Sequence, residues 1–576
     1  MAPPASSVAP ISRRPFRAYA AWMVAALVLA AAAYLPALAD PFVFDDGPAI
    51  VDNRSIRAAA TAFAPPVNTT ASGRPVLNAS LALSYALGGA GPAGFRGLNL
   101  LIHLAGALTL WGVLRRTLRG RDAEFAAATA ASLWLLQPLQ TESVTYIVQR
   151  AESLMGLLYL FTLYACIRGL EGTRRARGGW FGASVAACLL GMGTKEVMVS
   201  APVLVLLWDR TFRAGSLGAA WRARWPVYLG YAATWLWLAV LVLSTHGRAG
   251  TAGTESGVGF GTYWLTQPGA ILRYLRLALW PHPLVFDYGT EWVNRPLAAL
   301  PGVLAVAAAA FGVAVAAWRR TAGWRALGYA GGWFFAILAP TSLVPGNRQT
   351  AAEHRMYLAL IPVLALLVLA IVRLLGRRRA LAIALALPAF AVLTAARNRD
   401  YRSVLALWRD TVAKQPGNPH ARVDLGNALA ADPVNAAAAA AEYEGAIRLA
   451  PDLPQAHNDL ANLWARIPGR LDDAIAESRR TLRLAPTLAE AHNNLANALN
   501  SAGRPSEAAA EYEAALRLKP DYAIAHFNLA ITLLNFPGRM DEAIAHAETA
   551  VRLDPSMSAA RELLADLRAQ ERKGLR

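Results

Sequence analysis

The 576-residue chain is poor in charged residues and in cysteine. Charged residues make up 16% of the sequence, whereas a globular domain usually carries about a quarter. Hydrophobic residues make up 55%, and the long apolar runs end near residue 396. This composition excludes a wholly soluble enzyme, a disordered chain and a collagen-like fibre. Both cysteines, Cys166 and Cys188, lie inside apolar runs, so we expect no disulfide framework.

Lysine is scarce as well. Four of the 56 basic residues are lysine, the others are arginine, and the formal net charge is +18. A strongly basic chain is often a nucleic-acid-binding protein. In a chain full of apolar runs, arginines in cytoplasmic loops that set the membrane topology explain the charge better. We therefore expect no nucleic-acid partner.

The apolar runs predict an all-α, polytopic membrane bundle over residues 1–400. A membrane-spanning helix needs about 20 mainly apolar residues. The first run ends in Pro36-Ala37-Leu38-Ala39, which also resembles a signal-peptide cleavage site, but the length of the run favours a retained span. The eleven predicted spans cover residues 18–38, 97–114, 123–139, 152–167, 179–193, 196–208, 226–244, 298–317, 325–344, 356–372 and 380–396.

Clusters of arginine predict the orientation of this bundle. They lie near residues 13–17, 115–121, 174–177, 210–224, 319–325 and 373–379. All of them fall on the cytoplasmic side if the N-terminus is cytoplasmic, as the positive-inside rule requires. Eleven spans then place the C-terminal part on the extracytoplasmic side. In a bacterium this would be an inner-membrane protein with a periplasmic domain.

The C-terminal part, residues 401–576, carries an internal repeat. Prolines recur at spacings of 35, 35, 34 and 35 residues, at Pro416, Pro451, Pro486, Pro520 and Pro555. This is the period of the tetratricopeptide repeat (TPR), a pair of packed helices. The sequence therefore predicts an extracytoplasmic α-solenoid of TPR repeats after the bundle.

Two polar residue types recur at the repeat spacing. The histidines, His457, His492 and His526, are interpreted as positions on the repeat surface, because residues one full repeat apart rarely share a metal ion. The asparagines beside them are predicted to line a concave groove that binds an extended protein or peptide acceptor. These asparagines are Asn458, Asn493, Asn494 and Asn528.

Charged residues gather in the predicted outer loops. Asp45 and Asp46 directly follow the first span, in the segment FVFDDGPAI. Three further outer turns carry charged or polar candidates, namely Glu142, Arg150 and Glu152, then Lys195 and Glu196, then His354, Arg355 and Tyr357. Helix capping by the aspartates and ion pairs at helix ends are the structural alternatives. Charges from four turns beside apolar walls favour an active site for a membrane-dissolved substrate. Between these turns, residues 271–280 are predicted to form a short helix in the outer interface.

Taken together, these segments resemble the transmembrane and TPR repeat-containing (TMTC) proteins, which are glycosyltransferases of the GT-C class. The similar pieces, in order, are FVFDDGPAI, LQPLQTESVTYIVQRAESL, MGTKE, YLRLALWPHPLVFDY and EHRMYL, followed by the repeats. The resemblance implies a polyprenyl-phosphate-linked sugar as donor, with a hexose such as mannose, and a protein acceptor reached from outside. It favours Asp46 over Asp45 as the catalytic base.

General chemistry agrees with these implied roles. An attacking hydroxyl needs a base, which Asp45 or Asp46 would supply. A departing lipid phosphate needs cations, and Arg150, Lys195 and Arg355 are the candidates. A divalent metal on the carboxylate pair is compatible with the residues but not required by them. Two alternatives stay open: a non-catalytic TPR scaffold of the membrane, and a GT-C enzyme that glycosylates a lipid or a polymer.

Overall fold

The computed structural model describes residues 13–67, 69–245, 258–345 and 349–574, and the described residues form helices and loops without a strand. The chain divides into two compact units, Met1–Asp410 and Thr411–Arg576. The all-α class and the membrane-bundle-plus-TPR organisation predicted from the sequence are confirmed.

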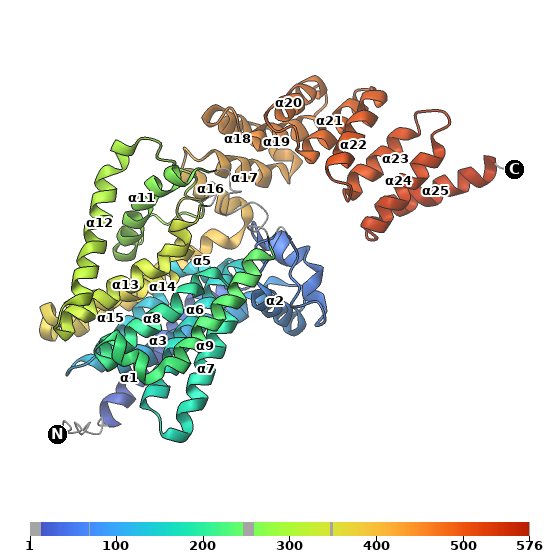
Figure 1. The fold of residues 1–576 in the computed structure, drawn as a ribbon. Coiled ribbons are helices and arrows are strands. Elements are labelled where there is room, and N and C mark those ends of the chain that lie inside the picture. Colours follow the sequence, from blue (N-terminus) through green and yellow to red (C-terminus); the bar gives the residue numbers. More distant parts are fainter. Residues whose placement is uncertain (1–12, 68, 246–257, 346–348, 575–576) are drawn as a thin grey trace, which may run out of the picture. The chain divides into compact units, whose positions relative to one another are not determined.

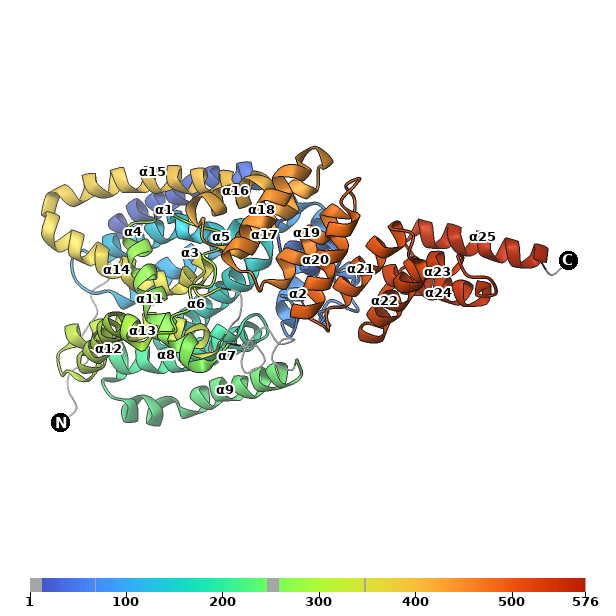
Figure 2. The same cartoon turned by 90° about the horizontal axis from the view of Figure 1, so that it is seen from above.

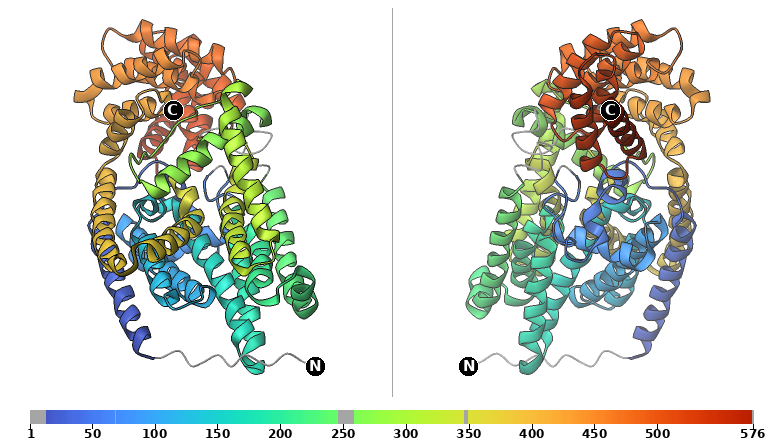
Figure 3. Two further views of the ribbon diagram at one scale, coloured as in Figure 1. Left: turned by 90° about the vertical axis from the view of Figure 1, so that its left-hand side faces the viewer. Right: turned by 90° about the vertical axis from the view of Figure 1, so that its right-hand side faces the viewer.

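The first unit is a bundle of long helices that run side by side (Figure 1 and Figure 3). Figure 2 shows α1 and α15 together along one edge and α9 along the opposite edge. Its helices are α1 (Arg13–Tyr34), α2 (Pro75–Gly88), α3 (Pro92–Thr117), α4 (Ala123–Leu136), α5 (Thr141–Thr145), α6 (Arg150–Glu171), α7 (Arg174–Met192), α8 (Ala201–Asp209), α9 (Leu217–Leu243), α11 (Phe260–Leu279), α12 (Pro296–Trp318), α13 (Ala322–Leu343), α14 (Met356–Leu375), α15 (Arg379–Asn398) and α16 (Val404–Lys414).

Short 3₁₀ or π turns connect many of these helices. In the first unit they are η1 (Leu35–Ala37), η2 (Gly47–Val51), η3 (Arg54–Arg57), η4 (Pro138–Gln140), η5 (Ile147–Gln149), η6 (Glu196–Ser200), η7 (Arg210–Ala214), η9 (Glu353–Arg355), η10 (Gly376–Arg378) and η11 (Arg399–Arg402). Most of the predicted site residues lie in or beside such turns.

Among the described residues, eight helical segments are long and apolar enough to cross a membrane. They correspond to eight of the predicted spans and cover Tyr19–Ala37, Pro92–Thr117, Ile147–Glu171, Leu217–Leu243, Pro296–Trp318, Ala322–Leu343, Glu353–Leu375 and Arg379–Arg402. The other three predicted spans correspond to α4, which has 14 residues, to α7, and to the η6–α8 segment. The number of spans therefore stays a prediction.

Glycine lets neighbouring helices approach closely in this bundle. A Cβ on Gly328 of α13 would lie 2.3 Å from the backbone nitrogen of Ala317 on α12, and one on Gly331 would lie 2.2 Å from Val313. Larger residues there would push the two helices apart, since contacts under about 3 Å are repulsive. Such small-residue contacts are typical of helix pairs in membranes.

One sequence expectation needs correction. Residues 271–280 are not a separate short helix, because α11 begins at Phe260 and runs for 20 residues to Leu279. Pro268 lies inside this helix without ending it. The apolar and aromatic residues before Ile271 continue the buried face, which includes Tyr263, Ala270 and Tyr274.

The second unit consists of helix pairs stacked in chain order (Figure 1). The repeat turns explain the spacing read from the sequence: Gly469, Gly503 and Gly538 join the two helices of a repeat with φ of 80°, 71° and 82°, which favours glycine. The helices are α17 (Pro419–Ala430), α18 (Ala436–Leu449), α19 (Pro454–Trp464), α20 (Leu471–Leu484), α21 (Ala489–Ser501), α22 (Pro505–Leu518), α23 (Ala523–Leu533), α24 (Met540–Leu553) and α25 (Ser558–Gly574), with η12 (Pro433–Asn435) before α18.

Candidate active site

The loop that follows α1 is anchored by Asp46. This carboxylate is fully buried, and its Oδ2 accepts a hydrogen bond from the backbone N–H of Val43 at 3.1 Å. Its Oδ1 accepts one from the N–H of Val148, in η5, at 2.9 Å. Asp46 therefore ties the loop after the first span to the turn that precedes α6, which lies about 100 residues further along the chain.

Burial has a strong effect on the acidity of Asp46. Loss of hydration raises its pKa to about 7, against the opposing effects of the two backbone hydrogen bonds and of Arg96. A carboxyl group with a pKa near neutrality has the acidity expected of a catalytic base.

Asp45 is the more accessible of the two aspartates. It is partly exposed, and its backbone N–H donates to the hydroxyl of Tyr146 at 3.1 Å. The preceding residue, Phe44, has φ of +46°, a conformation that costs a bulky side chain about 1–2 kcal/mol. The Phe44 ring contacts the rings of Phe286 and Trp408, at centroid distances of 6.2 and 5.7 Å. These ring contacts hold the strained backbone directly before the aspartate pair.

Arg96, on α3, fixes the start of the same loop. Its buried guanidinium donates to the carbonyl oxygens of Thr145 at 2.8 Å and of Pro41 at 2.6 Å, and also to that of Asp40. Sequence reasoning missed this residue. The available signal was a lone arginine near the start of an apolar run, where an unpaired charge is costly.

A second link joins α5 to η9 through Glu142 and His354. The carboxylate of Glu142 accepts the backbone N–H of His354 at 2.8 Å and lies 2.7 Å from its Nδ1. Burial alone would raise the pKa of Glu142, but the charge and hydrogen bonds of His354 outweigh it, so the pKa is lowered. Two sequence-predicted residues, 212 positions apart, are thus in direct contact.

Next to this link lies an ion pair that the sequence did not suggest. Glu353 is fully buried and accepts from the N–H of Val285 at 2.6 Å and from the hydroxyl of Tyr288 at 3.1 Å. Its other oxygen faces Arg397 at 3.4 Å, and Arg397 also binds Asp400 at 2.9 Å. The pair attaches the segment after α11 and the end of α15 to η9.

Lys195 and Glu152 form a buried ion pair at the starts of η6 and α6. The Nζ of Lys195 lies 2.6 Å from Oε1 of Glu152, and both side chains are less than 10% exposed. Burial lowers the pKa of Lys195, and the Glu152 charge opposes this shift. Glu152 and Arg355 line the same narrow gap between the helices. The structure therefore brings together three predicted residues.

Arg355 and Glu196 have looser contacts. Arg355 is partly exposed and donates to the carbonyls of Thr350 and Gln349, each at 3.3 Å. Glu196 is 30% exposed and pairs with Arg74 at 3.4 Å.

Two predicted residues lie deeper in the bundle. Arg150 is fully buried and donates to Asn99 Oδ1 at 2.6 Å and to the carbonyls of Ser80 and Phe95 at 2.7 Å each. The hydroxyl of Tyr357 lies 2.9 Å from His103 Nδ1 in an interior aromatic cluster. Oxygen atoms of the bundle thus accept hydrogen bonds from every nitrogen of the Arg150 guanidinium. The side chains of Arg150 and Tyr357 therefore hold bundle helices together.

In the repeat unit, two hydrogen bonds join the predicted groove asparagines to one another, and Asn528 also donates to Asn497 at 3.0 Å. Asn494 donates to Asn458 at 3.0 Å, and Asn528 contacts Asn493 at 3.4 Å. Asn493 is buried, and the other three are partly exposed. These contacts link the first helices of consecutive repeats and align the asparagines along them.

The interpretation of the repeat histidines as surface positions was wrong for His457, which is fully buried. Its Nε2 bonds the carbonyl of Pro451 at 2.9 Å, and its Nδ1 lies 2.5 Å from Glu477. His492 and His526 make the same bond to the proline carbonyl of their own repeats and are only partly exposed. A histidine in the first turn of a helix can bond to a carbonyl in the loop that precedes this helix. The repeat histidines therefore help to join one repeat to the next.

In the described parts of the chain, no group of three or more His, Cys, Asp or Glu side chains is placed to hold a metal ion.

The chain is similar to two groups of known proteins, tetratricopeptide-repeat proteins and protein O-mannosyl-transferases. The tetratricopeptide-repeat family profile matches residues 391–454, 463–523 and 493–558. The chain is 29% identical over 198 residues to protein O-mannosyl-transferase Tmtc2 of Drosophila melanogaster, covering 31% of this chain and 21% of that protein. It is 25% identical over 301 residues to Tmtc1 of the same organism (46% and 34%), and 32% identical over 143 residues to human TMTC4 (21% and 19%).

The chain thus spans between about a fifth and a third of the length of these curated relatives. Among solved structures, a thermophilic TPR protein of Thermus thermophilus, TTC0263, is 21% identical and covers 31% of this chain and 93% of its own, with a TM-score of 0.26. MamA from Desulfovibrio magneticus RS-1 is 18% identical over 27% of this chain and 85% of its own, with a TM-score of 0.24. The resemblance to the TMTC proteins predicted from the sequence motifs is confirmed.

Proposed function

We propose that this protein is a membrane glycosyltransferase that moves a hexose, mannose, from a polyprenyl-phosphate-linked donor to a hydroxyl group of a protein acceptor. The similarity to relatives named protein O-mannosyl-transferases supports the reaction class. The polyprenyl-phosphate donor and the protein acceptor are those that the resemblance to the TMTC proteins implies, and the arginine clusters support the extracytoplasmic side.

One observation carries the proposal: four outer turns, far apart in the sequence, are linked, because the turn from α5 to α6 contacts each of the other three. The loop after α1 binds η5 through Asp46. Helix α5, which immediately precedes η5, binds η9 through Glu142 and His354. Helix α6, which immediately follows η5, binds the start of η6 through Glu152 and Lys195. Buried charges are costly unless they are paired, and those that persist beside membrane spans commonly mark functional sites.

Asp45 is assigned as the base that contacts the acceptor hydroxyl. Asp45 is partly exposed and can be reached by a substrate, whereas Asp46 is fully buried and is bound to the backbone of Val43 and Val148. As the hydroxyl oxygen bonds to the anomeric carbon of the sugar, its proton passes to the Asp45 carboxylate. Asp46 positions the loop and places its own charge beside Asp45. This assignment differs from the preference for Asp46 that the family resemblance implies.

The cations act on the other side of the sugar. The bond between the anomeric carbon and the phosphate oxygen breaks, and the polyprenyl phosphate leaves with the electron pair. Arg355 lines the gap beside Glu152 and has a planar fork that fits phosphate oxygens. Lys195, held at 2.6 Å from Glu152, adds a point charge. Both would stabilise the negative charge that develops on the leaving group.

The TPR unit is assigned to the protein acceptor. Its asparagines project polar amides along consecutive first helices, a pattern suited to the backbone of an extended polypeptide. With the N-terminus in the cytoplasm, the outer turns and the TPR unit face the extracytoplasmic side.

The direct test is transfer by purified protein in detergent, with isotope-labelled polyprenyl-phosphate mannose and a mixture of extracytoplasmic proteins. Mass spectrometry should find one added hexose on serine or threonine of an acceptor protein. Nucleotide-linked mannose serves as the matched control donor and should give no product. Label recovered only in lipid or polymer, or transfer only from the nucleotide donor, would contradict the proposal.

A further inference from the structure

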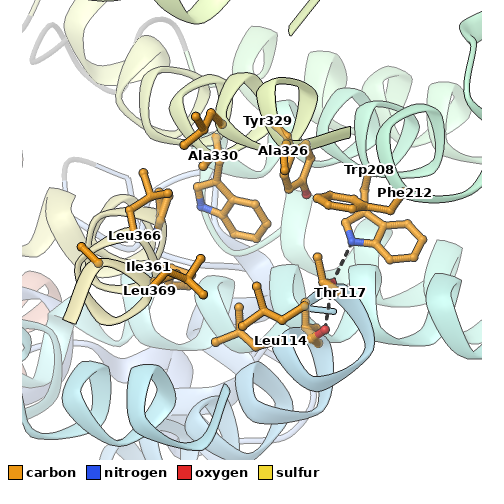
Figure 4. A pocket seen from close by; sticks show the side chains of 18 of the residues that line it. Leu114, Thr117, Trp208, Phe212, Ala326, Tyr329, Ala330, Ile361, Leu366 and Leu369 are labelled. Atoms are coloured by element: carbon orange, nitrogen blue, oxygen red, sulfur yellow. Dashed lines mark hydrogen bonds between the residues drawn. The ribbon is translucent and has the colours of Figure 1, made fainter. Parts of the chain in front are cut away.

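A large apolar cavity lies between the helices of the bundle. Its volume is about 760 Å³, within the range of about 300–1,000 Å³ of small-molecule sites. Figure 4 shows its walls: Leu114 of α3, Trp208 of α8, Phe212 of η7, Ala330 of α13 and Leu366 of α14, among others. The walls come from helices that are far apart in the sequence, so the cavity is a feature of the folded bundle.

The cavity reaches the end of the bundle opposite to the candidate active site and extends along α14 as far as Ile361, six residues after Arg355. On α3, Thr117 lines the cavity and lies 21 residues after Arg96, which is about 32 Å along a helix. On α14, Arg373 lines the cavity and lies 18 residues after Arg355, or about 27 Å. Both lengths match a hydrocarbon layer of about 30 Å. A ligand here would therefore come from the leaflet opposite to that of the sugar donor.

The mouth of this cavity is positively charged. Arg373 is exposed and has no ion-pair partner among the described residues. Arg319 and Arg320, directly before the lining residue Thr321, are likewise exposed. The carboxylates at this end are each paired with another arginine, in the pairs Asp122–Arg379, Glu124–Arg115, Glu171–Arg116 and Asp209–Arg224. No carboxylate in these pairs is therefore free to neutralise Arg373.

One shielded polar group in the cavity wall lacks a hydrogen-bond partner in the described structure. It is the hydroxyl oxygen of Tyr329. By contrast, Trp208 and Thr117 in the same wall are paired, since Trp208 donates to Thr117 at 2.9 Å and Thr117 donates to the carbonyl of Val113. Shielded polar groups are normally paired, so an unpaired hydroxyl in a cavity wall indicates a missing partner.

We propose that this cavity binds one anionic phospholipid from the arginine-rich leaflet. An acyl chain fills the apolar space between α13 and α14, and the headgroup phosphate lies at Arg373. The ester oxygens, the only polar atoms that enter with the chain, accept the hydrogen bond of Tyr329. Basic pockets between membrane helices select anionic headgroups in this way. The site is independent of the proposed transfer reaction.

The test is native mass spectrometry of the full-length protein, purified in detergent and titrated with phosphatidylglycerol or phosphatidylcholine of identical chains. The wild type should bind one phosphatidylglycerol about tenfold more tightly than phosphatidylcholine, the effect of one charge-assisted contact. Arg373→Gln should abolish this preference and retain chain binding. Arg378→Gln, which removes an exposed arginine on the same face outside the cavity, should behave as the wild type.

Ala330→Phe provides a second, independent variant. The larger side chain fills the cavity and should reduce binding of both lipids about tenfold or more, while thermal unfolding stays close to that of the wild type. The proposal is overturned if Arg373→Gln keeps the headgroup preference, or if Ala330→Phe binds both lipids as the wild type does. It is also overturned if a polyprenyl phosphate displaces phosphatidylglycerol at lower concentration than phosphatidylglycerol itself, because the cavity would then be a second donor site.

Discussion

Replacing Lys195 by methionine should destabilise the membrane unit strongly. The Nζ of Lys195 lies 2.6 Å from Oε1 of Glu152, and the two side chains are 7% and 3% exposed. Without the lysine, Glu152 is a buried carboxylate with no counter-charge. Breaking a buried pair on one side costs about 3–5 kcal/mol. The double variant Glu152→Gln, Lys195→Met leaves no uncompensated charge and should regain most of this stability.

The matched control is Glu196→Gln. Glu196 is 30% exposed and 3.4 Å from Arg74, so its pair is worth at most about 1 kcal/mol. Thermal unfolding of the detergent-solubilised variants, followed by tryptophan fluorescence, measures these differences. A Lys195→Met variant no less stable than Glu196→Gln would refute the reasoning.

Donor binding separates the structural role of Lys195 from its role toward the phosphate. The double variant should be stable but should bind polyprenyl-phosphate mannose about tenfold more weakly, because one phosphate contact is gone. Wild-type donor affinity in the double variant would limit Lys195 to its pairing with Glu152.

Three further outcomes are expected. The raised pKa of Asp46, about 7 in the folded protein against about 3.9 unfolded, means that the folded state holds more protons between these values. Unfolding free energy should therefore fall as the pH rises from about 4 to about 7, and Asp46→Asn should flatten this slope in thermal unfolding; an unchanged slope would contradict the assignment. Truncation after Lys414 should raise the KM for a protein acceptor and leave donor affinity intact, whereas unchanged acceptor kinetics would favour an assembly role for the repeats. Reporter fusions after Arg177 should read cytoplasmic and those after Asn418 exported, and the opposite result would remove the acceptor role of the TPR unit.

The repeat unit could be predicted closely from sequence because its signals are local. The proline period marks the end of each second helix, and small or aromatic residues such as Ala508, Tyr512 and Ala515 are buried where the repeat pattern requires. The role of the histidines was missed because it depends on a bond to a carbonyl in the preceding turn. Nothing in residue type distinguishes that position from an exposed one.

The candidate site could be predicted only in part. The motifs identified Glu142, Glu152, Lys195 and His354 as candidate site residues, because charges beside apolar spans are unusual in any sequence. Which charges share a pair could not be read, since partners such as Glu353 and Arg397 lie 44 residues apart and come together only through packing. Arg150 looked like an outer cation, yet the start of α6 directs it into the bundle.

The most direct test of the proposed chemistry is turnover by Asp45→Asn with polyprenyl-phosphate mannose and a protein acceptor, measured beside donor affinity. Asparagine keeps the shape of the side chain and cannot accept the proton. We expect a fall in kcat of about 10²- to 10⁴-fold with donor affinity unchanged. An Asp45→Asn enzyme that turns over within a few-fold of the wild type would contradict the assignment of Asp45 as the base.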